Sequence, residues 1–177
     1  MDKKLTLISP DAKNQISFIL ENGEIYYSTR RHYKANIKKS RIHLDMDEAS
    51  SLGNFQLISN EESLHDEEWF PVLGQKEKIN NRYRELEIEL QNGKEYSNIK
   101  TIKLYFRAYD DGVAFRYEIP EQEGLSKFII KSENICFRVS DRAQAWWIPA
   151  YQPDRYEYIY QKTLVEDMPA VHMPLTI

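Results

Sequence analysis

The stretch RELEIEL, Arg84–Leu90, has the pattern that decides the fold class of this chain. Acidic and apolar residues alternate along it, with glutamate at positions 85, 87 and 89 and leucine or isoleucine at positions 86, 88 and 90. Successive side chains of a β-strand point to opposite faces of the sheet. The stretch is therefore predicted to be a strand with one buried apolar face and one solvated acidic face.

The same alternation recurs on both sides of this stretch. ISFIL and GEIYYSTR are predicted to be two strands joined at Glu21–Gly23, because Asn-Gly between alternating runs is a strong hairpin signal. Turn residues at Gln91–Gly93, Asp110–Gly112 and Pro120–Gly124 separate further candidates. The other predicted strands are SRIHLDM, NFQLISN, YRELEIEL, IKTIKLYFRAY, VAFRYEIP, FIIKSEN, ICFRVS, AWWIPA and YEYIYQK.

The chain shows no long helical period, and NEESLHDEE at 60–68 is predicted to form one helical turn or a loop. About eleven short strands with frequent turns are typical of a β-sandwich. We therefore expect an all-β fold, a two-sheet antiparallel sandwich with few or no helices, in a single domain over residues 1–177.

Composition limits the classes of function. The chain is 41% hydrophobic and 29% charged, which indicates a globular protein rather than a disordered one. Its net charge of -4 argues against a nucleic-acid phosphate binder, and the basic residues between Arg30 and Arg41 are interpreted as a solvated strand–loop face. No apolar run of about 18 residues predicts a transmembrane helix. No secretory signal is visible.

The single cysteine and the C-terminal end each support one expectation. Cys136 lies in the apolar segment NICFRV, so it excludes an internal disulfide and is predicted to be a small buried core residue. Residues 163–177, TLVEDMPAVHMPLTI, have no clear period and end on the apolar trio Leu175–Ile177. Domain ends are more often polar, so we expect this end to be cut from a longer polypeptide.

The residues alone reveal no catalytic constellation. The four histidines lack the i, i+4 spacing of a helical zinc pair, and no G-x-S-x-G nucleophile elbow is present. The six glycines form no phosphate-binding loop. The acids of Asp110–Gly112 are interpreted as turn residues and those of Asp66–Glu68 as solvated. No catalytic residue is therefore assigned.

Glu157 stands out because it lies among tyrosines in RYEYIY, Arg155–Tyr160. As a strand, this segment would place its tyrosines on one face and Glu157 beside Ile159 on the other. One interpretation is a plain amphipathic strand. The other is a ligand or catalytic acid in a cleft, because a carboxylate on a partly apolar face needs a cation or hydrogen bonds. Carboxylate oxygens suit calcium, which takes about six to eight oxygen ligands, so Glu157 cannot form such a site alone.

The tryptophans leave a sugar-binding function open. In a strand Trp146 and Trp147 point to opposite faces, so at most one is expected in the main core, and the other needs a ligand or another domain. These rings, Trp69 and the tyrosines could stack on the apolar faces of sugars, although core packing is the commoner role of such rings. A stand-alone carbohydrate-binding module is therefore an alternative.

Two longer segments carry a resemblance to a known family. DEEWFPVLGQKEKINNRYRELEIEL and LYFRAYDDGVAFRYEIP resemble the N-terminal domain of glycoside hydrolase family 97. Members carry a W-x-P-V-x-G segment, here Trp69–Gly74, and an F-R-x-x-x-D-G-x-x-F-R-Y-E block, here Phe106–Glu118. ISPDAKNQISFIL and WIPAYQPDRYEYIY are also similar, so the resemblance runs from Leu5 to Tyr160. The family often has tryptophan in place of Leu73, a departure that affects packing more than chemistry.

The resemblance implies a fold, an activity and partners. Members are exported bacterial enzymes, periplasmic or secreted, that hydrolyse α-linked glucosides or galactosides. Their N-terminal domain is a β-supersandwich that packs on a catalytic (β/α)8 barrel of the same polypeptide.

The resemblance also implies a metal site. A calcium ion lies at the active site of the family, and one glutamate ligand comes from the N-terminal domain in an E-Y-x-Y context. Glu157–Tyr160 matches that context, so Glu157 is expected to bind calcium in the full-length protein and to lie near the active-site wall. Residues 1–177 include no barrel, so this chain alone is predicted to be inactive. A truncated glycosidase remnant is a further alternative.

Overall fold

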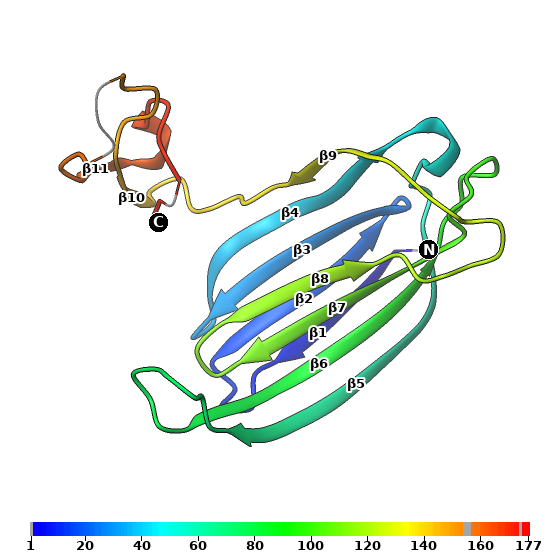
Figure 1. Cartoon of the computed structure of the whole chain (residues 1–177), viewed down its shortest axis with the longest axis horizontal. Coiled ribbons are helices and arrows are strands. Elements are labelled where there is room, and N and C mark those ends of the chain that lie inside the picture. The colour runs from blue at the N-terminus through cyan, green and yellow to red at the C-terminus, as the bar shows by residue number, and fades with distance from the viewer. Residues whose placement is uncertain (1, 154–156, 174) are drawn as a thin grey trace. The chain divides into compact units, whose positions relative to one another are not determined.

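The computed structural model describes residues 2–153, 157–173 and 175–177 (Figure 1). The described residues form eleven β-strands, two short 3-10 helices and no α-helix, which confirms the all-β prediction. The chain divides into two compact units, Met1–Arg138 and Val139–Ile177. The single domain expected over residues 1–177 stays a prediction, and each unit is described by itself below.

The first unit consists of two antiparallel sheets, ordered β1-β2-β3-β4-β9 and β5-β6-β7-β8. A 3-10 turn, η1, spans Glu48–Ser50 between β4 and β5. The strands of the first sheet are β1 Lys3–Ile8, β2 Asn14–Glu21, β3 Glu24–Arg31, β4 Lys34–Met46 and β9 Ile130–Ile135. The strands of the second sheet are β5 Gln56–Trp69, β6 Ile79–Gln91, β7 Thr101–Tyr109 and β8 Val113–Glu118.

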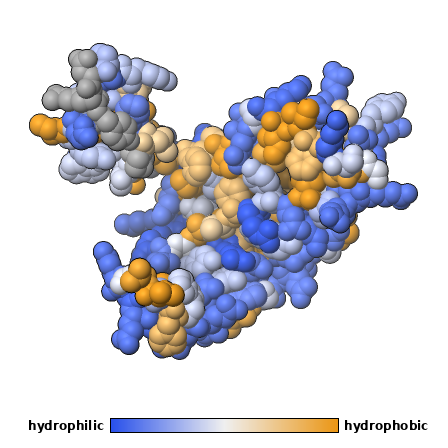
Figure 2. Space-filling view, in the orientation of Figure 1, coloured by the Kyte–Doolittle hydropathy of each residue, from blue (hydrophilic) through white to orange (hydrophobic). Residues whose placement is uncertain are grey.

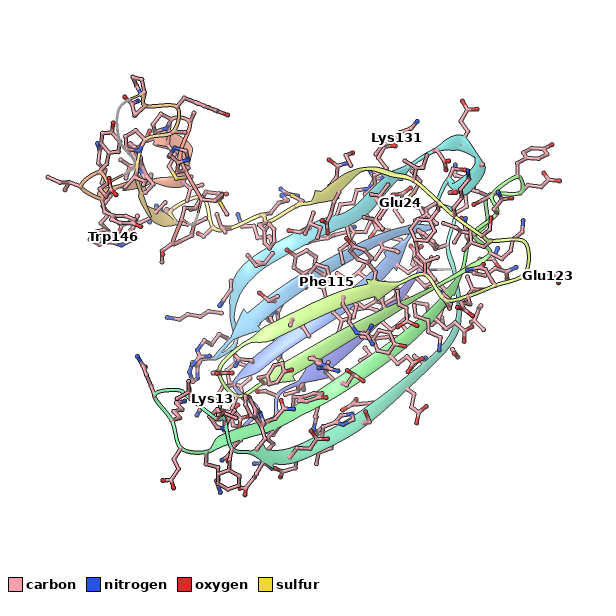
Figure 3. The ribbon with its side chains drawn as sticks, in the orientation of Figure 1. Lys13, Glu24, Phe115, Glu123, Lys131 and Trp146 are labelled. Atoms are coloured by element: carbon pink, nitrogen blue, oxygen red, sulfur yellow. The ribbon has the colours of Figure 1, made fainter. Side chains whose placement is uncertain are left out.

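The core lies between the facing sides of these two sheets. The apolar positions of RELEIEL, Leu86, Ile88 and Leu90, are buried in β6 and belong to one cluster with residues of β2, β3 and β4. Phe18 and Phe106 are fully buried and meet edge to face, with ring centroids 6.1 Å apart. The ring of Phe115 lies between the sheets, 5.1 Å from that of Tyr27 (Figure 3). The predicted two-sheet sandwich is therefore confirmed.

The Asn-Gly hairpin forms as predicted. β2 and β3 pair up to Glu21↔Glu24, and the two turn residues between them have left-handed backbones, with φ of 51° at Asn22 and 74° at Gly23. A Cβ added to Gly23 would lie 2.7 Å from the Cα of Asn54, so both the backbone conformation and the space favour glycine here. This turn sets the register that buries one face of β2.

The acidic stretch 60–68 is not a helical turn or a loop, and that prediction was wrong. It lies inside β5, an edge strand that pairs with β6 along its whole length and is exposed on nearly all of its positions. Two cations pair with its acids: Arg84 of β6 lies 3.1 Å from Glu62, and Lys78, just before β6, lies 2.5 Å from Glu68. The backbone ladder and these ion pairs therefore outweigh the polar composition of the stretch.

The prediction of a buried Cys136 was also wrong, since its side chain is exposed. Only Ile135 of the predicted strand ICFRVS belongs to a strand, at the end of β9. Beyond it the backbone follows the edge of β4. The amide of Cys136 donates to the carbonyl of Arg41, and its carbonyl accepts from the hydroxyl of Tyr27 at 2.9 Å. Backbone pairing, rather than burial of the thiol, holds this segment.

The second unit is small and contains its own two-stranded sheet. β10, Gln144–Trp147, pairs antiparallel with β11, Gln161–Leu164, and a 3-10 turn, η2, follows at Val165–Asp167. Isolated bridges Trp146↔Thr176 and Pro149↔Val171 bring the last residues alongside β10. None of the helices among the described residues has the length and apolarity needed to cross a membrane.

Candidate functional site

The segment that carries Glu157 is anchored in the second unit by β11. The pairing with β10 begins at Trp147↔Gln161 and ends at Gln144↔Leu164. Behind this ladder, four apolar side chains are buried: Ala145, Trp147, Ile148 and Ala150. A small buried cluster therefore fixes the point where residues 157–160 enter the unit.

The strand predicted over YEYIYQK is present only from Gln161 onward. Residues 157–160 form no strand, so the alternation that put Glu157 and Ile159 on one face does not exist there. Arg155 and Tyr156 lie outside the described residues. β10 offers only the four residues Gln144–Trp147 for pairing, which is why the ladder stops at Gln161.

Glu157 has an exposed side chain in this structure. Its neighbours differ in burial: Tyr158 is half-buried, whereas 90% of Ile159 and 54% of Tyr160 are exposed. A carboxylate at the surface keeps its charge at little cost and can approach a group brought to it. The segment thus presents one oxygen-donor side chain beside apolar and aromatic surface.

The described residues do not complete a metal site around Glu157. No group of three or more His, Cys, Asp or Glu side chains able to hold a metal ion occurs within residues 2–153, 157–173 and 175–177. Calcium takes about six to eight oxygens, of which one carboxylate supplies at most two. The donor type of Glu157 fits a hard cation, and the remaining ligands would have to come from outside the described residues.

The two adjacent tryptophans point to opposite faces, as predicted. Trp147 is 5% exposed, and its indole Nε1 donates to Oγ1 of Thr163 at 3.0 Å. Trp146 is 48% exposed and lies at the surface of this unit, with Nζ of Lys162 5.1 Å from its ring centroid (Figure 3). Trp147 is therefore a core residue of the unit, and Trp146 is the ring with free surface.

A second set of polar side chains covers the outer face of the second sheet in the first unit. Glu85 and Glu87, predicted to be simply solvated, accept hydrogen bonds from Arg107 and Lys103 across the strands. Burial opposes the charge of Arg107, but its hydrogen bonds to Glu85 and Tyr109 and the negative charge of Glu85 together outweigh that effect and raise its pKa. Sequence reasoning missed this network, although KLYFR and RELEIEL carry opposite charges on adjacent strands.

Three aromatic rings pack together beside these ion pairs on the outer face of the second sheet. Tyr83 is only 5% exposed although it points to the outer face. Its ring lies between those of His65, at 4.7 Å, and Tyr109, at 4.9 Å, with the guanidinium of Arg107 4.5 Å from its centroid. A sugar needs an open ring face on which to stack. The cluster offers none, and its role is to join β5, β6 and β7.

One crevice between the two sheets is too small for a ligand. Its volume is about 20 Å³, which holds about one water molecule. The walls are mainly apolar, with Tyr117 of β8 on one side and Leu44 of β4 on the other. This crevice therefore offers no room for a sugar.

Comparison with known proteins identifies relatives of the whole chain. The family model described as "Glycosyl-hydrolase 97 N-terminal" matches residues 7–177. Among solved structures, the chain is similar to a Glycoside Hydrolase Family 97 enzyme from Pseudoalteromonas sp. strain K8 in complex with acarbose, with a TM-score of 0.84 and 29% identity. The match covers 97% of this chain and 26% of that enzyme.

Two further structures extend the comparison. A variant of the same Pseudoalteromonas enzyme in complex with panose gives the same TM-score of 0.84 and the same coverages of 97% and 26%. A beta-arabinopyranosidase matches 89% of this chain and 26% of its own length, with a TM-score of 0.76 and 23% identity, and this likeness shows the fold alone. The chain thus spans about a quarter of the length of the solved structures that it matches.

Proposed function

Because the chain belongs to the glycosyl-hydrolase 97 N-terminal family, we propose that it is the non-catalytic β-sandwich of a calcium-dependent, exo-acting α-glycosidase and donates Glu157 to the calcium ion. In this proposal the catalytic carboxylates belong to a (β/α)8 barrel of the same polypeptide. The chain forms part of the wall of the active site, and by itself it is inactive.

The exposure of Glu157 carries this proposal. Its carboxylate stands at the surface, four residues before β11, whose pairing with β10 ties down the end of its segment. Held ligands lose less entropy on binding a metal than free ones. When bound, calcium would supply positive charge that orients the hydroxyl groups of a sugar. The part of Glu157 is to hold that charge at the domain boundary.

The complexes of the Pseudoalteromonas enzyme support the substrate class. Acarbose and panose both contain α-linked glucose-like rings, so an α-linked oligosaccharide is the proposed substrate of the polypeptide that contains this domain. Glucosides and galactosides are both compatible with this class. A periplasmic or secreted location fits an enzyme that acts on imported or external oligosaccharides.

The test uses the complete polypeptide that contains this domain. Glu157→Gln keeps the shape of the side chain and removes its charge, so the calcium concentration that gives half-maximal hydrolysis should rise at least tenfold. Calorimetric titration with calcium should show the same loss of affinity. Glu166→Gln, which changes another exposed acid of the same unit, is the matched control and should leave both values unchanged. An unaltered calcium response in the Glu157 variant would remove the ligand role.

The half-exposed ring of Trp146 supports a second candidate, a carbohydrate-binding module that works without the barrel. Sugar stacking on this ring would change its fluorescence. A titration with maltose up to millimolar concentration should then give a saturable signal that Trp146→Ala removes and Trp69→Ala keeps. A flat titration rules this candidate out and leaves the truncated-remnant alternative to be judged by the mass of the native product.

A further inference from the structure

The hairpin of β5 and β6 extends beyond the rest of its sheet as a two-stranded arm. β7 pairs with β6 only as far as Tyr83↔Tyr109, whereas β5 and β6 continue together from Asp66↔Arg82 to Trp69↔Ile79. In Figure 1 this hairpin projects at the lower left of the sandwich. The arm therefore carries its connecting loop away from the core of the first unit.

The end of this arm is apolar and exposed. The loop begins with the sequence WFPVLG, Trp69–Gly74, which we call the apolar tip. Figure 2 shows hydrophobic side chains gathered at the end of this hairpin. The exposed fractions are 49% for Trp69, 67% for Phe70, 98% for Val72 and 89% for Leu73.

Two other tight turns of the first unit are polar, and the β3–β4 turn exposes a single ring, that of Tyr33. The β2–β3 turn is Asn22–Gly23, and the β7–β8 turn is Asp110–Gly112, both built from residues that water solvates well. Scattered exposed apolar residues need no explanation, but a contiguous group with two aromatic rings at one place is typical of an interaction surface. The composition of the apolar tip is therefore an exception within this sandwich.

The arm holds the apolar tip in a fixed position. At its base the ring of Tyr83 is enclosed by those of His65 and Tyr109. Along the stem Asp66 pairs with Arg82 at 3.4 Å and Glu68 pairs with Lys78 at 2.5 Å. A surface that is ordered before binding loses less entropy when it binds. The stem charges are also largely matched, so the apolar group dominates the end of the arm.

We propose that the apolar tip docks into an apolar recess on a further domain of the same polypeptide, outside residues 1–177. This inference rests on the proposed function. The solved relatives match this chain over only 26% of their length, so about three quarters of each relative lies outside the matched part. Covalent attachment gives a neighbouring domain a high effective concentration, so a small apolar contact can be occupied permanently.

The chemistry of the arm disfavours other occupants. Residues 66–82 carry four carboxylates and three cations, so the arm offers no basic cluster for an anionic lipid surface. Val72 and Leu73, which are more exposed than Trp69 and Phe70, are aliphatic and lack the ring faces on which sugars stack. A large aromatic side chain set among aliphatic ones is instead typical of the centre of a protein–protein contact.

Cysteine accessibility in the complete polypeptide tests the docking. Val72→Cys places a thiol at the most exposed tip position, and Tyr33→Cys places one at the β3–β4 turn, where Tyr33 is 84% exposed. Each variant is treated with a maleimide under native and denaturing conditions, and labelling is measured on the peptide that contains the new cysteine. Position 72 should react at least tenfold more slowly in the native protein, and position 33 should react at similar rates in both states.

A second variant gives an independent readout. Val72→Asp should lower the melting temperature of the complete polypeptide, because a carboxylate cannot enter an apolar recess without loss of hydration, whereas Tyr33→Asp should not. Native labelling of position 72 as fast as that of position 33 overturns the docking. Protection that disappears on dilution assigns the apolar tip to a second copy, and protection that requires lipid vesicles assigns it to a membrane; both overturn it too.

The outcomes separate this inference from the proposed function. If position 72 is unprotected but Glu157→Gln weakens the calcium response, only the docking fails. If position 72 is protected but the calcium response is unchanged, only the ligand role fails. A native product without a domain beyond these residues overturns both, and its intact mass reveals that case.

Discussion

Replacement of Asn92 by alanine should cost the first unit about 3 kcal/mol of stability. Asn92 is 5% exposed, and its side-chain amide joins two loops of the sandwich. Its Oδ1 accepts from the amide of Gly53 at 3.0 Å, and its Nδ2 donates to the carbonyls of Ser51 and Ile99, each at 2.8 Å. A fourth and longer bond comes from the amide of Lys94 at 3.3 Å, and the three shorter bonds, at about 1 kcal/mol each, give the expected total.

The loss can be measured by urea unfolding followed by far-ultraviolet circular dichroism. In a protein of this size, about 3 kcal/mol corresponds to roughly 6 to 12 °C in melting temperature. Asn134→Ala is the matched control. Asn134 is exposed and its amide bonds only to the hydroxyl of Ser132, so its removal should cost less than about 0.5 kcal/mol. Hydrogen exchange gives a local readout, since the amide of Gly53 loses its acceptor and should exchange faster.

Asn92→Asp refines this prediction. The aspartate keeps the acceptor for Gly53 but turns a carboxylate oxygen towards the carbonyls of Ser51 and Ile99. These carbonyls should raise the pKa of the new carboxyl group above its ordinary value, so stability should fall as the pH rises through about 4 and recover in acid. A loss below about 1 kcal/mol in the alanine variant, or a stability of the aspartate variant that does not depend on pH, would refute the reasoning.

Two further predictions concern a glycine and a tyrosine. Gly23→Ala should cost about 2 kcal/mol in urea unfolding, because φ is +74° and the new Cβ would lie 2.7 Å from Asn54. Gly124→Ala, where φ is +78° but no atom lies within 4 Å of the new Cβ, should cost only about 1 kcal/mol. Equal losses of stability in the two variants would contradict the steric argument. Burial and the hydrogen bond to Glu133 raise the pKa of Tyr117 to about 12. Since the pKa of Tyr117 is higher in the folded protein than the unfolded value near 10, stability should hold below about pH 10 and fall between about pH 10 and 12. Tyr117→Phe should make this fall of stability with pH shallower. An unchanged dependence of stability on pH in this variant would show that Tyr117 does not contribute.

Much of the sandwich could be predicted because its strands are half-buried. Alternation in RELEIEL reports directly which side chains meet the opposite sheet, and Asn22–Gly23 fixes where two strands turn. The start of β5 was predicted as the strand NFQLISN, but its continuation over 60–68 was not, because at an edge the side chains face water on both sides and no alternation is required. Its structure comes from the backbone of β6, and a single strand's composition does not contain that information.

The candidate site could be predicted less well for a related reason. A carboxylate such as Glu157 shows its role through the groups it meets, and the described residues hold no group of three or more potential metal-binding side chains from which that role could be read. Its segment was taken for a strand because tyrosine and isoleucine have high strand propensity, yet β10 offers no residues to pair with it. The tryptophans were predicted correctly, because successive side chains of a strand point to opposite faces, and Trp147 is buried while Trp146 is exposed.

The open side of β5 has a practical consequence for handling the protein. An unpaired strand edge is a template for another copy of the same chain, and side-by-side association of such edges leads to aggregates. Two β5 strands brought edge to edge would place their clustered acids, Glu61, Glu62 and 66–68, against one another, so charge repulsion keeps the molecules apart near neutral pH. Salt at about 1 M shortens the range of that repulsion to about 3 Å and weakens the protection. High-salt elution is therefore the purification step to avoid, and turbidity that rises with salt concentration would show that charge repulsion along β5 keeps the molecules apart.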